Sequence, residues 1–75
     1  MTITAVDSTS LRTIGYDDER QPLPVEFHNR SIYQYFEVPA TVYRELMQAP
    51  SKGAYFNRSI RPSFDFVLVK AASLS

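Results

Sequence analysis

Five prolines limit the length of every regular element that this 75-residue chain can form. Proline has a fixed φ and no backbone N–H, so it interrupts both helices and paired strands. Pro22 ends a polar stretch, Pro39 ends an aromatic segment, and Pro50 and Pro62 enclose a short segment with helical character. The sequence therefore predicts a fold built from short strands and short helices.

The chain has material for one small domain. A chain of this length buries only about 60% of the surface that it exposes when unfolded, so its core is thin. It has no cysteine, which excludes a disulfide framework and a thiolate metal site. Apolar residues make up 44% of the sequence, with five tyrosines and five phenylalanines, which favours a folded domain over a disordered segment. We predict one domain at residues 8–69 and flexible termini at 1–7 and 70–75.

The first half of the sequence contains three segments with the composition and alternation of β-strands. Polar turns separate them, and Asn29 in the second turn is suited to a positive φ. The third segment is strongly aromatic and β-forming. The predicted strands are residues 11–16, 23–27 and 32–38.

Two short helices are predicted next. Apolar residues recur at three- and four-residue spacings between Ala40 and Ala49, with Pro39 at the first helical position. Ser51 is a good N-cap for a second helix, because its hydroxyl accepts from amides two or three residues further on. We expect this helix to finish at Arg61, because a residue before proline is disfavoured in the helical region.

A last strand is predicted at residues 64–69, where phenylalanine and leucine alternate with other residues. The element order is then β-β-β-α-α-β. This order indicates an α+β fold: an antiparallel sheet of three to four strands with two short helices on one face.

The third predicted strand has two different faces. Tyr33 and Tyr35 share one face, and Ile32, Phe36 and Val38 share the other. Alternation alone does not say which face is the core. Exposed tyrosines on a sheet can stack on unpaired bases. Buried tyrosines would instead lie beneath the helices, with their hydroxyls reaching polar partners.

The net charge of zero excludes the large basic excess that marks many nucleic-acid-binding proteins. It is the sum of two unequal halves: residues 1–43 carry a net charge of −3 and residues 44–75 a net charge of +3. In the positive half, Lys52, Arg58 and Arg61 flank Tyr55 and Asn57. Such a cluster suits a few phosphate contacts and a weak, salt-sensitive RNA complex. Arginines near a helix C-terminus also complement the helix dipole without any ligand.

Residues for catalysis or metal binding are scarce. His28 is the only histidine, and it lies in a predicted hairpin turn. The acidic run at residues 17–19 lacks the spaced oxygen ligands of a calcium loop. Gly15 and Gly53 are the only glycines, which excludes a glycine-rich phosphate loop. We therefore predict that the protein is not an enzyme, with no catalytic residues, no metal site and no cofactor.

No targeting or membrane segment is visible in the sequence. The start lacks the basic region of a signal peptide, and the longest apolar run, residues 66–69, is far too short to span a bilayer. We expect a cytoplasmic protein without a membrane partner.

Several short motifs together resemble one known family. They are Ile14-Gly15-Tyr16-Asp17, Leu23 with Val25 and Phe27, Tyr33-Gln34-Tyr35, Val38-Pro39, Val42-Tyr43, Leu46, Ala49-Pro50-Ser51-Lys52-Gly53, Tyr55-Phe56-Asn57 and Ile60-Arg61. In this order they resemble the KTSC domain, a small module found at the C-terminus of some lysyl-tRNA synthetases and alone in bacterial and phage proteins. The resemblance spans roughly residues 8–66. The chain departs from the family at Asn29-Arg30, where glycine is usual, and at Phe64-Asp65-Phe66, which lacks the family's tyrosines.

The resemblance implies RNA binding, which has been suggested for the family from its position in a tRNA synthetase. We therefore predict a non-catalytic binding module, with RNA, tRNA included, as the first candidate ligand. Homodimerisation or binding to another protein is the alternative, because the last strand would leave a sheet edge open to augmentation. The candidate RNA-binding residues are Tyr33, Tyr35, Lys52, Tyr55, Asn57, Arg58 and Arg61.

Overall fold

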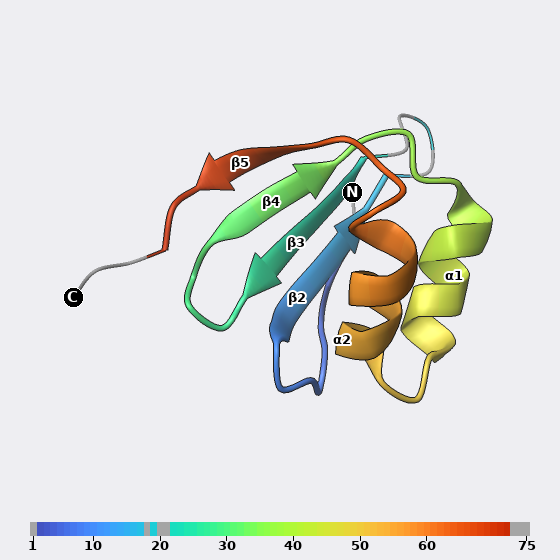
Figure 1. Cartoon of the computed structure of the whole chain (residues 1–75), viewed down its shortest axis with the longest axis horizontal. Helices are drawn as coiled ribbons and strands as arrows, with labels where there is room; N and C mark the ends of the chain where they lie inside the picture. The colour runs from blue at the N-terminus through green and yellow to red at the C-terminus, as the bar shows by residue number, and fades with distance from the viewer. Residues whose placement is uncertain (1, 18, 20–21, 73–75) are drawn as a thin grey trace.

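The predicted strands form one antiparallel sheet, and the helices pack on one of its faces (Figure 1). The computed structural model describes residues 2–17, 19 and 22–72. Its five strands follow one another across the sheet in the order β1-β2-β3-β4-β5. The α+β class is thereby confirmed. The elements are β1 (Thr2–Ala5), β2 (Leu11–Tyr16), β3 (Leu23–Phe27), β4 (Ile32–Tyr35), α1 (Ala40–Gln48), α2 (Lys52–Tyr55), η1 (Phe56–Ile60) and β5 (Phe66–Lys70).

The sheet has five strands, so the predicted number of three to four is wrong. The additional strand is β1, in the segment 1–7 that the sequence prediction left outside the domain. Thr2 pairs with Tyr16, and Ala5 pairs with Thr13 of β2. The strand buries little, since Ile3 remains 66% exposed. Its stability therefore comes mainly from backbone pairing, which leaves no hydrophobic pattern for a sequence prediction to find.

The turn between β3 and β4 is tight, as predicted, but its positive φ falls on Arg30 (74°) and not on Asn29. Asn29 instead accepts hydrogen bonds through Oδ1 from the amide and the hydroxyl of Ser31, at 3.0 and 2.6 Å. The amide of Phe27 donates to the carbonyl of Ser31, so the loop that this pair closes is residues 28–30. A left-handed residue at the end of such a loop is typical of hairpins. The predicted polar loop at residues 17–22 lies partly outside the described residues.

β4 is shorter than the predicted strand 32–38. It ends at Tyr35, and Glu37 takes a left-handed conformation with φ of 56°. This conformation breaks the two-residue alternation. Val38 is consequently fully buried, although alternation placed it on the face opposite to the buried Tyr35. Its carbonyl accepts a hydrogen bond of 2.6 Å from the hydroxyl of Tyr16.

The helical segments begin close to their predicted positions. Pro39 is the N-cap of α1 and precedes its first helical residue, Ala40. Ser51 caps α2 as predicted, because its hydroxyl accepts from the amide of Ala54 at 3.3 Å. The prediction that Pro62 forces Arg61 out of the helical region is wrong: its φ is −53° and its ψ is −46°.

The reason for this conformation is a continuous series of turns. The amide of Arg61 donates to the carbonyl of Phe56, five residues earlier, which makes η1 a π-helical turn. The amides of Ser63 and Phe64 then both donate to the carbonyl of Ile60. The chain thus keeps turning past Pro62, whose missing N–H leaves no unpaired donor there.

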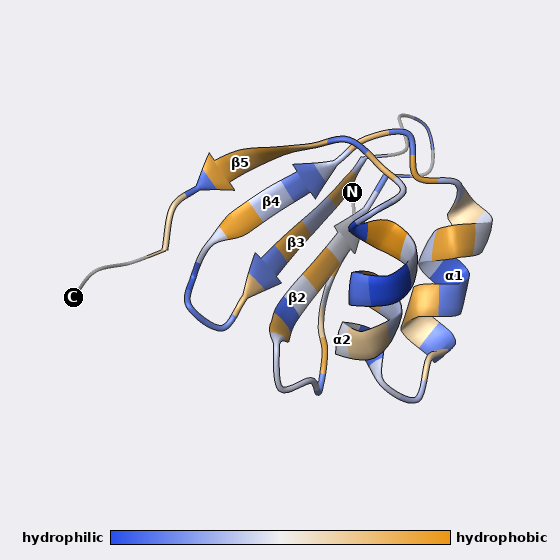
Figure 2. Ribbon diagram, viewed as in Figure 1, coloured by the Kyte–Doolittle hydropathy of each residue, from blue (hydrophilic) through white to orange (hydrophobic). Residues whose placement is uncertain are grey.

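The core lies between one face of the sheet and the single layer of helices that covers it (Figure 2). β2 and β3 contribute most of the sheet side, and α1 and η1 contribute the residues that cover it. The fully or almost fully buried apolar residues are Leu11, Ile14, Tyr16, Leu23, Val25, Tyr35, Val38, Leu46, Phe56 and Ile60.

We predict that Leu46→Ala destabilises the protein far more than Leu68→Ala. Leu46 is fully buried, so truncation removes transfer free energy and leaves a cavity, at a cost of about 2–5 kcal/mol. Leu68 is 53% exposed, so the same truncation should cost about 0.5 kcal/mol or less. Urea unfolding of both variants at low micromolar concentration measures the difference. Equal losses of stability would contradict this assignment of the core.

Candidate nucleic-acid-binding cleft

Five aromatic rings form a continuous cluster beneath β3, β4 and β5. Phe56 of η1 lies at its buried end, with ring centroids 5.7 Å from Phe27 and 5.2 Å from Tyr35. Phe66 of β5 lies at its exposed end, 5.6 Å from Tyr33 and 5.2 Å from Tyr35. Most of these pairs meet edge to face, the favourable arrangement for aromatic rings. The cluster therefore begins in the core and ends at the surface.

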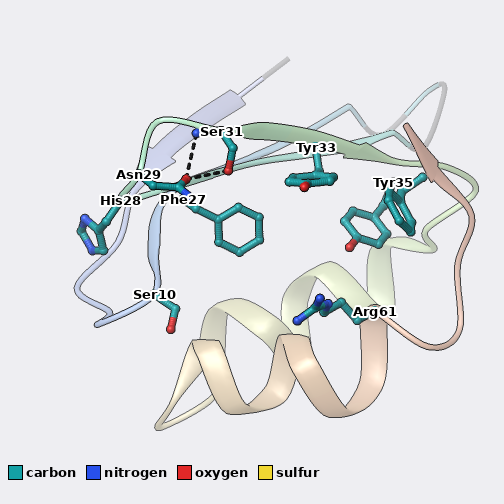
Figure 3. A pocket seen from close by; sticks show the side chains of 9 residues that line it. Ser10, Phe27, His28, Asn29, Ser31, Tyr33, Tyr35 and Arg61 are labelled. Carbon is teal, nitrogen blue, oxygen red and sulfur yellow. Dashed lines mark hydrogen bonds between the residues drawn. The ribbon is translucent and has the colours of Figure 1, made fainter. Parts of the chain in front are cut away.

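The exposed part of this cluster lines a cleft of about 460 Å³ between the sheet and the end of η1 (Figure 3). Its apolar wall consists of Phe27, Tyr33, Tyr35 and Phe66. In Figure 3 the ring of Tyr33 is seen nearly edge-on beneath the sheet, so one ring face is turned toward the helical layer. The cleft thus presents an aromatic surface to a flat ligand group.

The two tyrosines of the cleft differ in burial although they share one face of β4. Tyr35 is only 2% exposed, whereas Tyr33 is half-buried. Both hydroxyls lack a hydrogen-bond partner among the described residues, so both remain available to a ligand. Burial raises the pKa of Tyr35, and the nearby positive charge of Arg61 opposes part of that rise. Tyr35 is therefore a neutral donor at physiological pH.

Arg61 provides the positive charge of the cleft. Its guanidinium points from the end of η1 into the space below the tyrosines (Figure 3). Nη1 donates to Oδ1 of Asn57 at 3.3 Å, one helical turn earlier. The side chain is exposed, and its planar guanidinium retains further donors for a phosphate or carboxylate. Asn57 therefore orients the cation, although it does not itself line the cleft.

Polar groups close the other end of the cleft. Ser10, His28, Asn29 and Ser31 lie there. Nε2 of His28 lies 2.7 Å from the carbonyl oxygen of Ser8, so this nitrogen must be the donor. The contact connects the β3–β4 turn to the loop before β2. The histidine thus has a structural contact that explains its position in the turn.

Besides Asn57, three of the predicted RNA-binding residues lie outside the cleft. Nζ of Lys52 donates to the carbonyl of Ala49 at 3.4 Å. The hydroxyl of Tyr55 donates to Oε2 of Glu45 at 2.7 Å, and this hydrogen bond raises the pKa of Tyr55. Arg58 is exposed on η1. The structure therefore brings together Tyr33, Tyr35 and Arg61, with Asn57 as a support, and does not bring the other three to the cleft.

The sequence reasoning did not select Phe27 and Phe66 as site residues. Both were assigned to strands, and their place in the cleft depends on strand register. Phe66 pairs with Tyr35 across β4 and β5, so the two side chains share a face. The sequence does contain a signal for Phe66: aromatic residues alternate in both of the predicted strands that pair, 32–38 and 64–69. The described residues include no cluster of side chains arranged to hold a metal ion.

Comparisons with known proteins agree with this fold. Residues 7–64 match the model of the KTSC domain. The crystal structure of a KTSC domain protein from Yersinia pestis superimposes with a TM-score of 0.87 at 31% sequence identity, covering 91% of this chain and 96% of that one. An uncharacterised protein of Stutzerimonas stutzeri is 45% identical over 58 residues, which cover 77% of this chain and 82% of the relative.

A second kind of relative is much longer than this chain. A lysine–tRNA ligase of Nostoc punctiforme is 38% identical over 60 residues. The match covers 80% of this chain but only 11% of the ligase. The similarity therefore concerns one small part of that enzyme. With a family match over most of its length and relatives of its own size, the chain belongs to the KTSC domain family.

Proposed function

We propose that this protein is a non-catalytic module that binds single-stranded RNA and takes one unpaired base into the aromatic cleft. The observation that carries the proposal is the meeting of Tyr33, Phe66 and Arg61 around one open cleft. Aromatic faces beside a cation are the usual means of holding an unpaired nucleotide. A volume of about 460 Å³ is within the range of ordinary small-ligand pockets.

Stacking would supply most of the affinity. The ring of Tyr33 presents a face to the cleft, and the hydroxyls of Tyr33 and Tyr35 are available to the edge of a base. Stacking of one base on an aromatic side chain contributes about 1–3 kcal/mol. It requires no particular base, because every base has a π face. We therefore expect weak sequence preference.

Charge would add a small, salt-dependent contribution. Among the described residues, Arg61 is the cation that lines the cleft, and the exposed Arg58 lies one turn before it on η1. A complex with so few phosphate contacts has a shallow dependence on salt compared with strongly basic proteins. Such a weak charge contribution agrees with the charge of the chain, which is zero in total and positive in residues 44–75.

The comparisons suggest tRNA as the RNA to test first. A similar segment occurs within lysine–tRNA ligases, whose name refers to tRNA. Our proposal includes action in the cytoplasm, where such an RNA is found. In the part of the chain that the structure describes, no helix has the length and apolar character to cross a membrane. Self-association, the alternative function, involves β5 and is compatible with an RNA-binding cleft.

We predict that Tyr33→Ala weakens binding of a short labelled oligouridine and of bulk tRNA by about 5- to 150-fold, the loss of one stacked base. Phe36→Ala is the matched control, because Phe36 is an aromatic of the same segment that does not line the cleft. Fluorescence anisotropy at low salt gives both affinities. If the two variants lose affinity equally, or if the unmodified protein binds neither RNA, the cleft is not an RNA site.

We predict that Arg61→Gln reduces the salt dependence of the same binding. Loss of one phosphate contact to a single strand lowers the slope of log affinity against log salt concentration by about 0.7. Arg44→Gln is the control, since Arg44 is an exposed arginine of α1 that does not line the cleft. An unchanged slope in the Arg61 variant would show that phosphate is bound elsewhere or not at all.

A further inference from the structure

β5 is an apolar strand with one unpaired edge. It pairs with β4 on one side, and it is the last strand of the sheet in the described structure. All its residues are exposed, including Phe66 at 50%, Val67 at 48% and Leu68 at 53%. Figures 1 and 2 show this apolar strand at the outer edge of the sheet, away from both helices. Natural edge strands are usually protected by charges, prolines or a covering segment, and the first four residues of β5 carry no charge and no proline.

The hydrogen bonds to β4 show which backbone groups of β5 are free. The amide of Phe36 donates to the carbonyl of Asp65 at 2.9 Å, and the register continues with Gln34 opposite Val67. In an antiparallel pair the peptide groups of successive residues point alternately toward the partner and away from it. Asp65 and Val67 therefore bond toward β4. The N–H and C=O groups of Phe66 and Leu68 point toward the free edge.

We propose that a second copy of this chain pairs with that edge, antiparallel, about a two-fold axis at Val67. In this register Phe66 lies opposite Leu68 of the second copy, and Leu68 lies opposite Phe66 of the second copy. Each pair brings together backbone groups that point outward in both copies. The two sheets join into one continuous sheet, with both helical layers on the same side. This proposal does not rest on RNA binding.

The same strand supplies both halves of a complementary interface, which is why a second copy is the partner that we assign. A two-fold axis perpendicular to the sheet requires opposite residues to share a face, and Phe66 and Leu68 do so. Both are large and apolar, as is Val67, which meets itself on the opposite face. The molecule has no net charge, so two copies do not repel each other through their overall charge.

One strand pair is a small interface. Stable complexes bury about 800 Å² on each partner, more than a pair of five-residue strands provides. We therefore expect a weak dimer, with a dissociation constant of about 0.1–1 mM. Sedimentation equilibrium or concentration-dependent NMR relaxation covers this range.

The position of the axis gives a specific test. In Val67→Glu two glutamates would face each other with their Cβ atoms about 5 Å apart, and in Val67→Lys two lysines would do so. We expect each variant alone to weaken dimerisation by about fivefold or more. An equimolar mixture of the two variants should restore association, because each carboxylate then faces an ammonium group. Isotope labelling of one variant distinguishes the mixed dimer in NMR spectra.

Ile3→Glu and Ile3→Lys are the matched controls. Ile3 is an exposed apolar residue of β1, the opposite edge strand of the sheet. These substitutions should leave dimerisation unchanged. A second variant, Leu68→Pro, removes an outward N–H that β4 does not use, so it should abolish pairing while circular dichroism remains that of the folded protein. Three results would overturn the proposal: a monomer at 1 mM, a dimer unaffected by Val67→Glu, or folded Val67 variants whose mixture fails to associate.

Discussion

The contact of Phe56 with the sheet connects the two layers of this protein. Phe56 is 1% exposed, and its ring meets Phe27 of β3 and Tyr35 of β4 edge to face. It also begins the π-helical turn that ends at Arg61. One buried side chain thus fixes the second helical segment over the sheet and determines where the cation after it emerges. In a chain too small to bury much surface and without a disulfide, few other contacts can serve this purpose.

The helices cover only part of the sheet, and both the aromatic cleft and the free edge of β5 result from that incomplete cover. The buried residues concentrate on β2, β3 and the end of β4, whereas every residue of β5 is exposed. At the boundary, the aromatic cluster leaves the core and becomes the wall of a cleft. Tyr35 lies on the covered side of this boundary and Tyr33 at its margin. The sequence left open whether the two tyrosines are core or surface residues. The structure makes Tyr35 a core residue and places Tyr33 at the surface.

Much of the fold could be predicted from local sequence signals, because prolines, a serine cap and alternating apolar residues act over a few residues. The predictions that failed depended on backbone pairing or on backbone conformations that residue type alone does not determine. β1 is held by backbone pairing, Glu37 reverses the alternation after β4, and Arg61 stays helical before a proline because the turn continues. For the cleft, alternation correctly placed Tyr33 and Tyr35 on one face. It could not exclude Lys52, which donates a hydrogen bond to the carbonyl of Ala49 three residues earlier, or Tyr55, which donates one to Glu45 of α1.

Phe66 belongs to both proposed surfaces, because its ring lines the cleft while its backbone faces the free edge of β5. Pairing of a second copy would place another Leu68 beside this ring on the helix side of the sheet. The dimer would thereby extend the apolar wall of each cleft without closing it from the side of Arg61. Val67 lies on the opposite face of the same strand, so a charge there acts on the pairing and leaves the cleft wall intact. Successive side chains of β5 point to opposite faces of the sheet. RNA binding and dimerisation could therefore be changed separately by substitutions within the same strand.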